Sequence, residues 1–289
     1  MRHRIDPLIA ERAPWLYHNW PAMSLVRSGL HTLLGYHATV ALAEGFTDES
    51  APIIMQQMGQ RLANHVSVSG LGHIPSHGPA LIVANHPTGI ADGIILHSLV
   101  SKVRKDAYFF ANRDILRVLP QLDCMIAPVE WRTRQRSHAT TRQTMAYVRA
   151  ATAAGRLGVI FPSGRLAKRR GLRLYERPWM ASAAMLARKS DMPVIPVNIQ
   201  ARNSALFYLF DMIHPTLRDI TLFHETLNKS GQLFRITIGE PISAASIPRN
   251  SEDGIKLLRK ATLALGGHQT QTVNLLSASR LRGGPVRPD

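Results

Sequence analysis

The sequence is poor in cysteine. Cys124 is the single cysteine among 289 residues, so no internal disulfide can form. A chain of this kind is typical of a reducing compartment such as the cytoplasm. Because Cys124 opens the apolar run 124–129, we expect it to be a buried packing residue of a strand rather than a nucleophile.

Long hydrophobic runs are also missing. The longest uncharged run near the start, 28–43, has 16 residues and includes His31, Gly35 and His37, whereas a membrane-spanning helix needs ~20 apolar residues. The first fifteen residues mix acids with bases and lack the apolar core of a secretion signal. We therefore expect a chain that stays in the cytosol or on the cytoplasmic face of a membrane.

Motifs for nucleotides and metals are absent as well. There is no GxGxxG sequence, no phosphate-loop lysine motif and no Cys/His spacing of a metal site. His65, His73 and His77 are close in sequence, but no cysteine or carboxylate pattern accompanies them. We expect neither a cofactor nor a metal ion.

Acidic residues are few. The chain has 35 Lys and Arg against 19 Asp and Glu, a net charge of +16. Between Lys102 and Lys189 there are 19 basic against five acidic residues, a net of +14, whereas residues 1–50 are almost neutral. Such a basic segment attracts phosphates, anionic lipids or acidic proteins, unless its arginines are only solvated. The basic run 165–173 has no interleaved aromatic residue, which argues against nucleic acid.

Apolar runs alternate with helical patterns from residue 65 onward. Continuous Val/Ile-rich runs separated by helices favour an α/β fold with a mostly parallel sheet covered by helices on both faces. Ligands of such sheets gather at the carboxyl ends of the strands. The expected strands are 65–71, 80–84, 107–111, 124–129, 158–161, 193–199 and 234–239, and the expected helices are 91–103, 137–154, 179–189, 215–229 and 251–265.

Three parts of the chain differ in composition. We expect an N-terminal amphipathic helical segment over 1–50, a main domain over 51–266 and a flexible basic tail over 267–289. Within the first part, Trp15 and Trp20 lie among leucines, a pattern that suits a membrane interface. A helical hairpin packed on the main domain has the same pattern.

The stretch "LIVANHPTGIADG", residues 81–93, places a histidine at the end of a buried strand. A neutral imidazole at His86 could take a proton from a hydroxyl, and a carboxylate at Asp92 could fix its tautomer and stabilise the imidazolium. A sharp turn at residues 87–89 would bring the two side chains face to face. The spacing alone favours a helix-capping Asp92 and an incidental His86, because such a pair arises often by chance.

A second strand end lies in "GVIFPSGRLAKRRG", residues 158–171. Gly164 would let the backbone approach a ligand closely, and Arg165 and Lys168 could grip an anion. Taken alone, this stretch is equally a strand, a turn and a solvated basic run.

Together the two stretches resemble the glycerolipid acyltransferases, the superfamily of lysophosphatidic acid acyltransferase. Asn85-His86 with Asp92 resembles the first block of that superfamily, and 161–166 resembles the Phe-Pro-Glu-Gly-Thr-Arg block. The run "MIAPVEWR" ending at Arg132 and the run "PVIPVNI" at 193–199 resemble the two other blocks.

Further runs resemble the bacterial branch of hemolysin-like proteins and lyso-ornithine lipid O-acyltransferases. These are 111–120, 200–210, 214–231 and 235–242. Five residues separate His86 from Asp92, as in that branch, where most of the superfamily has four. Ser163 stands in place of the usual glutamate, and Arg165-Leu166 in place of Thr-Arg. These departures argue against a plain lysophosphatidate acceptor.

The resemblance implies a peripheral enzyme on the cytoplasmic face of the inner membrane. It would move a fatty acyl group from acyl-carrier protein or acyl-CoA to the hydroxyl of a membrane lysolipid, without an acyl-enzyme. His86 and Asp92 would be catalytic. The alternatives are a 1-acylglycerol-3-phosphate acyltransferase and a non-catalytic, membrane-binding hemolysin-like protein. Amide N–H groups near Gly89 or Gly164 would stabilise the oxyanion, and the substrate-binding residues would be Asn85, Gly89, Arg132, Ser163, Gly164, Arg165 and Lys168.

Overall fold

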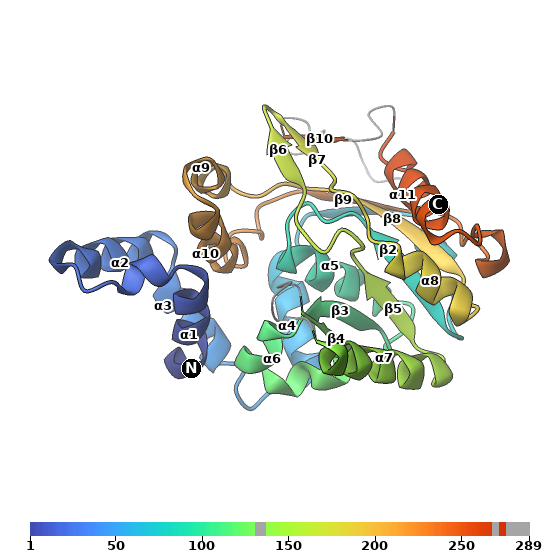
Figure 1. Cartoon of the computed structure of the whole chain (residues 1–289), viewed down its shortest axis with the longest axis horizontal. Coiled ribbons are helices and arrows are strands. Elements are labelled where there is room, and N and C mark those ends of the chain that lie inside the picture. Colours follow the sequence, from blue (N-terminus) through green and yellow to red (C-terminus); the bar gives the residue numbers. More distant parts are fainter. Residues whose placement is uncertain (131–136, 268–271, 276–289) are drawn as a thin grey trace.

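A seven-stranded sheet forms the centre of the computed structural model, which describes residues 1–130, 137–267 and 272–275 (Figure 1). Its strand order is β1-β9-β8-β2-β5-β3-β4. All neighbouring strands are parallel except β8 and β9, which are antiparallel. The predicted α/β class with a mostly parallel sheet is confirmed. The strands are β1 Val66–Ser69, β2 Ala80–Ala84, β3 Tyr108–Asn112, β4 Ile126–Val129, β5 Leu157–Ile160, β8 Val194–Gln200 and β9 Phe234–Ile238.

Helices cover both faces of the sheet because side chains alternate along each strand. On one face Ile82 of β2 lies in a core cluster with residues of α4 (Ala51–Leu62) and α5 (Ile90–Val100). On the other face Leu81 and Val83 lie in a cluster with residues of α7 (His138–Ala153), α8 (Ser182–Lys189) and α11 (Ser251–Ala264). All five residues of β2 are buried, as a strand covered on both faces requires.

Several helix boundaries follow from local signals in the sequence. Ser137 caps α7 by accepting a hydrogen bond from the Thr140 amide at 3.1 Å, as predicted. The predicted helix from residue 179 starts only at Ser182, because Pro178 and Trp179 belong to the preceding turn. The remaining helices are α6 Asp114–Val118, α9 Ala205–Ile213 and α10 Pro215–Glu225, with short 3₁₀ helices at Pro120–Met125, Leu71–His73 and Ala244–Ser246.

The N-terminal helices pack partly on the main domain. They are α1 (Arg2–Arg12), a 3₁₀ turn (Pro14–Tyr17), α2 (Pro21–Leu33) and α3 (Tyr36–Glu44). Leu8 of α1 and Leu16 of the 3₁₀ turn lie in the core cluster of α4 and α5. Arg12 pairs with Asp114 at 2.7 Å, and the indole N–H of Trp15 donates to Thr216.

Helix α2 differs from its neighbours because it leaves large apolar side chains exposed, among them Trp20 and Leu25. The first segment therefore combines a packed hairpin with an apolar surface. The proposed division at residues 50 and 266 stays a prediction. Across the described ranges, no helix combines the length and the apolar character that crossing a membrane requires.

Two features differ from the sequence-based expectation. Cys124 is exposed and lies in the 3₁₀ helix Pro120–Met125, so its prediction as a buried strand residue is wrong. The ladder with β3 starts only at Ile126, and the Cys124 carbonyl instead accepts hydrogen bonds from Tyr147 and Arg156. In addition, β6 (Lys168–Arg170), β7 (Arg173–Tyr175) and β10 (Thr272–Asn274) form a second sheet. Strand β10 falls within the predicted flexible tail, most of which lies outside the described residues.

Candidate active site

The first strand end is fixed to its neighbour by Asn85. Its side-chain amide donates to the Ile199 carbonyl at 2.8 Å and accepts from the Ile199 amide at 2.7 Å. Both polar ends of this buried side chain therefore clamp β2 to β8. The predicted role of Asn85 in binding substrate stays untested, and in this structure its polar atoms already have partners.

His86 and Asp92 face each other directly after that clamp. Nδ1 of His86 lies 3.0 Å from Oδ2 of Asp92; the His86 side chain is 19% exposed and that of Asp92 is fully buried. The contact is close but does not have hydrogen-bond geometry, and within the described ranges buried Nδ1 has no other hydrogen-bond partner. The imidazole stacks on Phe161, with ring centroids 4.2 Å apart and an interplanar angle of 24°. With Nδ1 directed at Asp92, Nε2 is the ring nitrogen that can take a proton from a substrate.

The turn between the two residues holds the Asp92 carboxylate. Oδ2 accepts hydrogen bonds from the amides of Thr88 at 2.9 Å and Gly89 at 3.0 Å, and Oδ1 accepts one from the Thr88 hydroxyl. Asp92 therefore caps α5 and faces His86 at the same time. Gly89 has φ 96°, and a Cβ atom there would lie 3.2 Å from Leu166, so the turn favours glycine.

Two of the amides near the expected oxyanion site already have acceptors. The Gly89 amide is already bonded to Asp92, and the Gly164 amide donates to the Phe161 carbonyl at 2.9 Å. Neither N–H is free to stabilise an oxyanion in this conformation.

The second strand end lies against the first. The Ala167 amide donates to the His86 carbonyl at 2.9 Å, so the two turns predicted from separate stretches meet. Ser163 is buried and its hydroxyl donates to the Arg165 carbonyl at 2.8 Å. Arg165 is exposed, as is Lys168. Arg132 lies outside the described residues.

Glu176 is a site residue that the sequence patterns did not reveal. Its buried carboxylate accepts the His86 amide at 3.2 Å and the Trp179 indole N–H at 2.9 Å. Burial raises the pKa of Glu176, and the Ser163 hydroxyl is among the groups that oppose the rise. A buried glutamate thus lies beside the position at which the superfamily's usual glutamate is replaced by serine. Nothing in the spacing of residues 175–178 indicates this.

Arg177 is a second site residue without a signal in the sequence patterns. It is half-buried and its Nε donates to the Leu166 carbonyl at 2.9 Å. Burial lowers its pKa, as do the nearby cations Arg165 and Arg218. A guanidinium held near other cations is suited to an anionic ligand.

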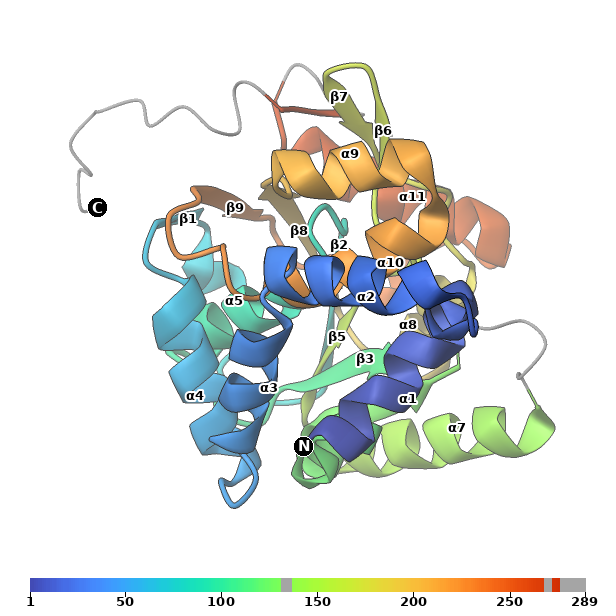
Figure 2. The ribbon, with the colours of Figure 1, turned by 90° about the vertical axis from the view of Figure 1, so that its left-hand side faces the viewer.

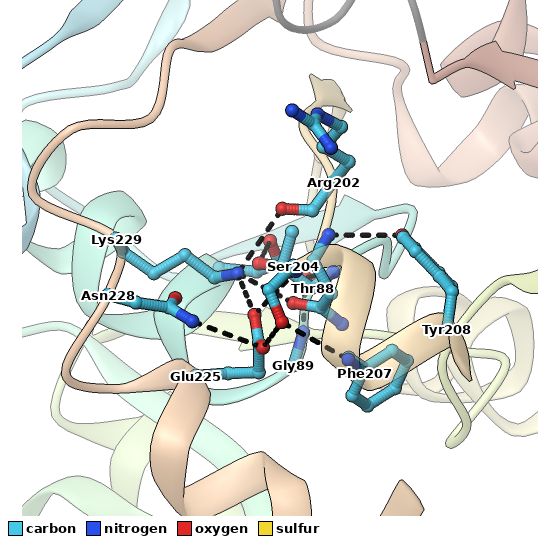
Figure 3. Close-up of polar contacts among 11 residues, drawn as sticks. Thr88, Gly89, Arg202, Ser204, Phe207, Tyr208, Glu225, Asn228 and Lys229 are labelled. Atoms are coloured by element: carbon cyan, nitrogen blue, oxygen red, sulfur yellow. Dashed lines mark hydrogen bonds and ion pairs between the residues drawn. The ribbon is translucent and has the colours of Figure 1, made fainter. Parts of the chain in front are cut away.

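A buried polar network lies beside Thr88 and Gly89, whose amides donate to Asp92 (Figure 3). Its centre is an ion pair between Lys229 and Glu225, both buried, with Ser204, Asn203 and Tyr208 around it. The predicted helix 215–229 ends at Glu225, so Lys229 lies in the turn that follows. Within the residues that the structure describes, no three His, Cys, Asp or Glu side chains gather as possible metal ligands.

The family comparison matches this part of the chain. Residues 65–200 fit the family model described as Acyltransferase, and the match includes both turns of the site. Over this range the chain is similar to an acyltransferase domain. The predicted relation to the glycerolipid acyltransferase superfamily is thereby confirmed.

Two relatives and one solved structure extend the comparison. A lyso-glycine lipid O-acyltransferase of Phocaeicola vulgatus is 26% identical over 183 residues, which are 61% of this chain and 64% of that protein. The protein of the same name from Bacteroides thetaiotaomicron is 21% identical over 244 residues, 82% of this chain and 87% of that one. The crystal structure of the 1-acyl-sn-glycerophosphate acyltransferase PlsC from Thermotoga maritima has a TM-score of 0.48 and 18% identity, and covers 82% of this chain and 94% of its own. The alignment with the first relative thus spans just under two thirds of that protein's length.

Proposed function

We propose that this acyltransferase domain esterifies the free hydroxyl of a lysolipid by general-base catalysis. Nε2 of His86 takes the hydroxyl proton as the oxygen attacks the carbonyl carbon of a thioester. The C–O bond forms, the C–S bond breaks, and the imidazolium returns the proton to the thiolate. The donor is acyl-carrier protein or acyl-CoA. The observation that carries the proposal is the 3.0 Å contact between His86 and buried Asp92 at the carboxyl end of β2.

The arrangement needs no nucleophile on the protein. Cys124 precedes β4, which runs parallel to β3, β5 and β2. It therefore lies at the amino ends of the strands, at the opposite edge of the sheet from His86. A direct transfer from thioester to hydroxyl follows, with the charge of Asp92 stabilising the imidazolium as it forms.

The acceptor that we propose is a lysolipid with an acidic head group that contains an amino acid. Both curated relatives are named lyso-glycine lipid O-acyltransferase, and a lyso-ornithine lipid is of the same class. Arg165 and Arg177 beside the His86 turn can bind a carboxylate or a phosphate through forked hydrogen bonds. Lysophosphatidic acid is the alternative acceptor, which the replacement of the usual glutamate by Ser163 disfavours.

Peripheral binding to the cytoplasmic face of the inner membrane is also a proposal. Trp20 and Leu25 at α2 are 72% and 75% exposed, and Met212 and Ile213 of α9 are 64% and 61% exposed. Figure 2 views the molecule from the side on which both helices lie. Apolar side chains in such numbers on one side suit the headgroup region of a bilayer.

The test combines two donors with three acceptors. Labelled acyl-carrier protein thioester and acyl-CoA are each incubated with lyso-glycine lipid, lyso-ornithine lipid or lysophosphatidic acid. We expect His86→Ala to lower transfer by roughly 10²–10⁴-fold, Asp92→Asn to lower it less, and His77→Ala, an exposed histidine on another loop, to leave it unchanged.

Two outcomes would contradict the proposal. A folded His86→Ala variant with wild-type turnover would exclude the general-base mechanism. Vesicle binding without transfer from either donor to any acceptor would favour the non-catalytic, hemolysin-like alternative.

A further inference from the structure

The buried ion pair of Lys229 and Glu225 lies outside the two turns that make up the site. We propose that this pair positions Asp92 and balances its charge, and so sets the pH range in which His86 is neutral. The proposal rests on the function proposed above, in which neutral His86 is the base. Lys229 and Glu225 are thus positioning residues and touch no substrate.

Lys229 has a complete set of partners in the protein interior. Its fully buried ammonium donates to the Glu225 carboxylate, to Oδ1 of Asn203 at 2.8 Å and to the Arg202 carbonyl at 3.2 Å. Three donors therefore meet three acceptors (Figure 3). Burying an ammonium ion is costly unless it is paired in this way, so the site is built to keep a positive charge.

Glu225 connects the pair to the start of α9. Its carboxylate accepts the Ser204 amide at 3.0 Å, the Ser204 hydroxyl and the Asn228 amide group at 3.2 Å. Ser204 in turn caps α9 by accepting from the Phe207 amide. These contacts alone would explain a purely structural pair that holds the start of α9 against the end of α10.

Asp92 gives the pair a second role. Burial lowers the pKa of Lys229, but Glu225 and Asp92 both oppose that change. Burial raises the pKa of Tyr208, and Glu225 and Asp92 add to the rise. The geometry agrees: Figure 3 shows Thr88 and Gly89 beside the pair, and the amides of these two residues donate to the Asp92 carboxylate.

The net charge of this buried cluster follows from three side chains. Asp92 and Glu225 carry two negative charges and Lys229 one positive charge, so the cluster has a net charge of −1 that a protonated His86 would neutralise. Burial alone would raise the pKa of Glu225, but Lys229 and the Ser204 donors hold that pKa below its ordinary value, so Glu225 stays charged. Removing Lys229 makes the net charge of the cluster more negative, whereas removing Glu225 makes it less negative.

Other charged groups surround His86 but cannot replace the pair. Glu176 contacts the His86 amide, and burial raises its pKa, which favours its neutral form. Arg202 lies beside Lys229 just after β8, and Arg177, which donates to the Leu166 carbonyl, lies near Arg165. The pair combines opposite charges, so removing each member in turn tests the two signs at one place.

The test uses the opposite signs of the two charges. Lys229→Met leaves Asp92 and Glu225 uncompensated, which stabilises the imidazolium, so the titration midpoint of His86 should move to higher pH. Glu225→Gln removes one negative charge, so the cluster stabilises the imidazolium less. The titration midpoint of His86 should therefore move to lower pH. Each shift should be on the order of one pH unit. The double variant restores the net charge and should return close to the wild-type midpoint.

Two measurements separate this inference from the function on which it rests. The first is the NMR titration of the His86 ring, assigned by its absence in His86→Ala. The second is the pH profile of kcat/KM, whose acid limb should follow the titration. Asp253→Asn and Lys256→Met remove charges from an exposed pair on α11 and should shift neither.

The outcomes are distinct. An unchanged His86 titration in folded Glu225→Gln, or shifts of the same sign in both single variants, would overturn the inference. Glu225→Gln keeps the shape of the side chain and decides the case if Lys229→Met fails to fold. A shifted titration with an unshifted acid limb would support the charge balance and contradict the role of His86 as base.

Discussion

The buried carboxylate of Asp92 is held by several hydrogen-bond donors. The two amides of Thr88 and Gly89 and the Thr88 hydroxyl all donate to it, and His86 lies on its remaining side. The amides are fixed by the turn, whereas the hydroxyl depends on a single side chain. A buried hydrogen bond to a charged group contributes about 1.5–3 kcal/mol, so Thr88 is the partner whose contribution can be measured directly.

We expect Thr88→Val to lower the free energy of unfolding by about 1.5–3 kcal/mol. Valine has nearly the shape of threonine, so the change removes the donor and little else. The Asp92 carboxylate should then be oriented less firmly toward the His86 ring. Turnover should therefore fall, though less than in Asp92→Asn. Thermal unfolding and initial rates measure the two effects. The control is Thr221→Val, where the buried hydroxyl donates only to the Leu217 carbonyl of its own helix. Equal losses of turnover in both variants would contradict a specific role for Thr88.

The sequence could predict the facing pair but not its surroundings. His86 and Asp92 flank one short turn, so a strand end and a helix start are enough to bring them together. Glu176 and Lys229 reach the site only through the packing of distant segments, and a lone glutamate or lysine in a sequence has no pattern. Asn85 is the converse case, because its position beside His86 indicated substrate binding whereas tertiary contact with Ile199 gives it a structural role.

At the scale of elements, the hairpin of β6 and β7 concentrates positive charge. Arg170 and Arg173 are directly opposite each other in its antiparallel ladder, a placement that costs stability because like charges repel. Lys168, at the start of β6, is exposed as well. A hairpin that keeps such repulsion is suited to an anionic partner, and acyl-carrier proteins are strongly acidic.

We therefore expect Arg170→Glu to affect stability and turnover in opposite directions. The introduced carboxylate would face Arg173, so the melting temperature should stay or rise slightly. Turnover with acyl-carrier protein should fall several-fold and lose part of its salt dependence, because electrostatic steering is screened by salt. Turnover with acyl-CoA should change little.

The matched control changes the same charge elsewhere. Arg149 is exposed on α7, on the other side of the sheet from the hairpin in Figure 1. Arg149→Glu should leave the preference between donors unchanged. An equal loss with both donors in Arg170→Glu would show that the hairpin serves the acceptor or the membrane instead.

The elements themselves differ in how far the sequence determines them. All seven strands of the central sheet can be predicted. Inner strands such as β2 are continuous apolar runs, whereas β1 and β9 alternate apolar with polar residues. The hairpin cannot be predicted, because its strands are three residues long and β6 is wholly basic. Its third partner, β10, comes from a segment whose polar composition predicts a tail.

The whole molecule has two distinct sides. Figure 1 places α2, α9 and α10 on the left and the central sheet to their right, and Figure 2 shows α2 and α9 on the near face. Leu222 of α10 lies beside Gly89, so this end of the molecule adjoins the catalytic turn. A membrane against α2 and α9 would therefore hold a lysolipid acceptor close to His86.

Membrane binding should depend on this face rather than on the basic surface alone. Deleting residues 13–46 would remove buried core residues such as Leu16 and Leu34 together with the exposed ones, so loss of binding could reflect misfolding.

Substituting Leu25→Glu and Met212→Glu instead places charges on α2 and α9 at exposed positions, where little packing is lost. We expect the double variant to be released from vesicles of anionic lipid at low salt, while the wild type is released only in part by high salt, because burial of apolar area is not screened. Co-sedimentation measures both. The control Ile53→Glu charges an exposed apolar residue of α4 and should leave binding unchanged. Complete release of the wild type by salt would assign the binding to the basic residues between Lys102 and Lys189.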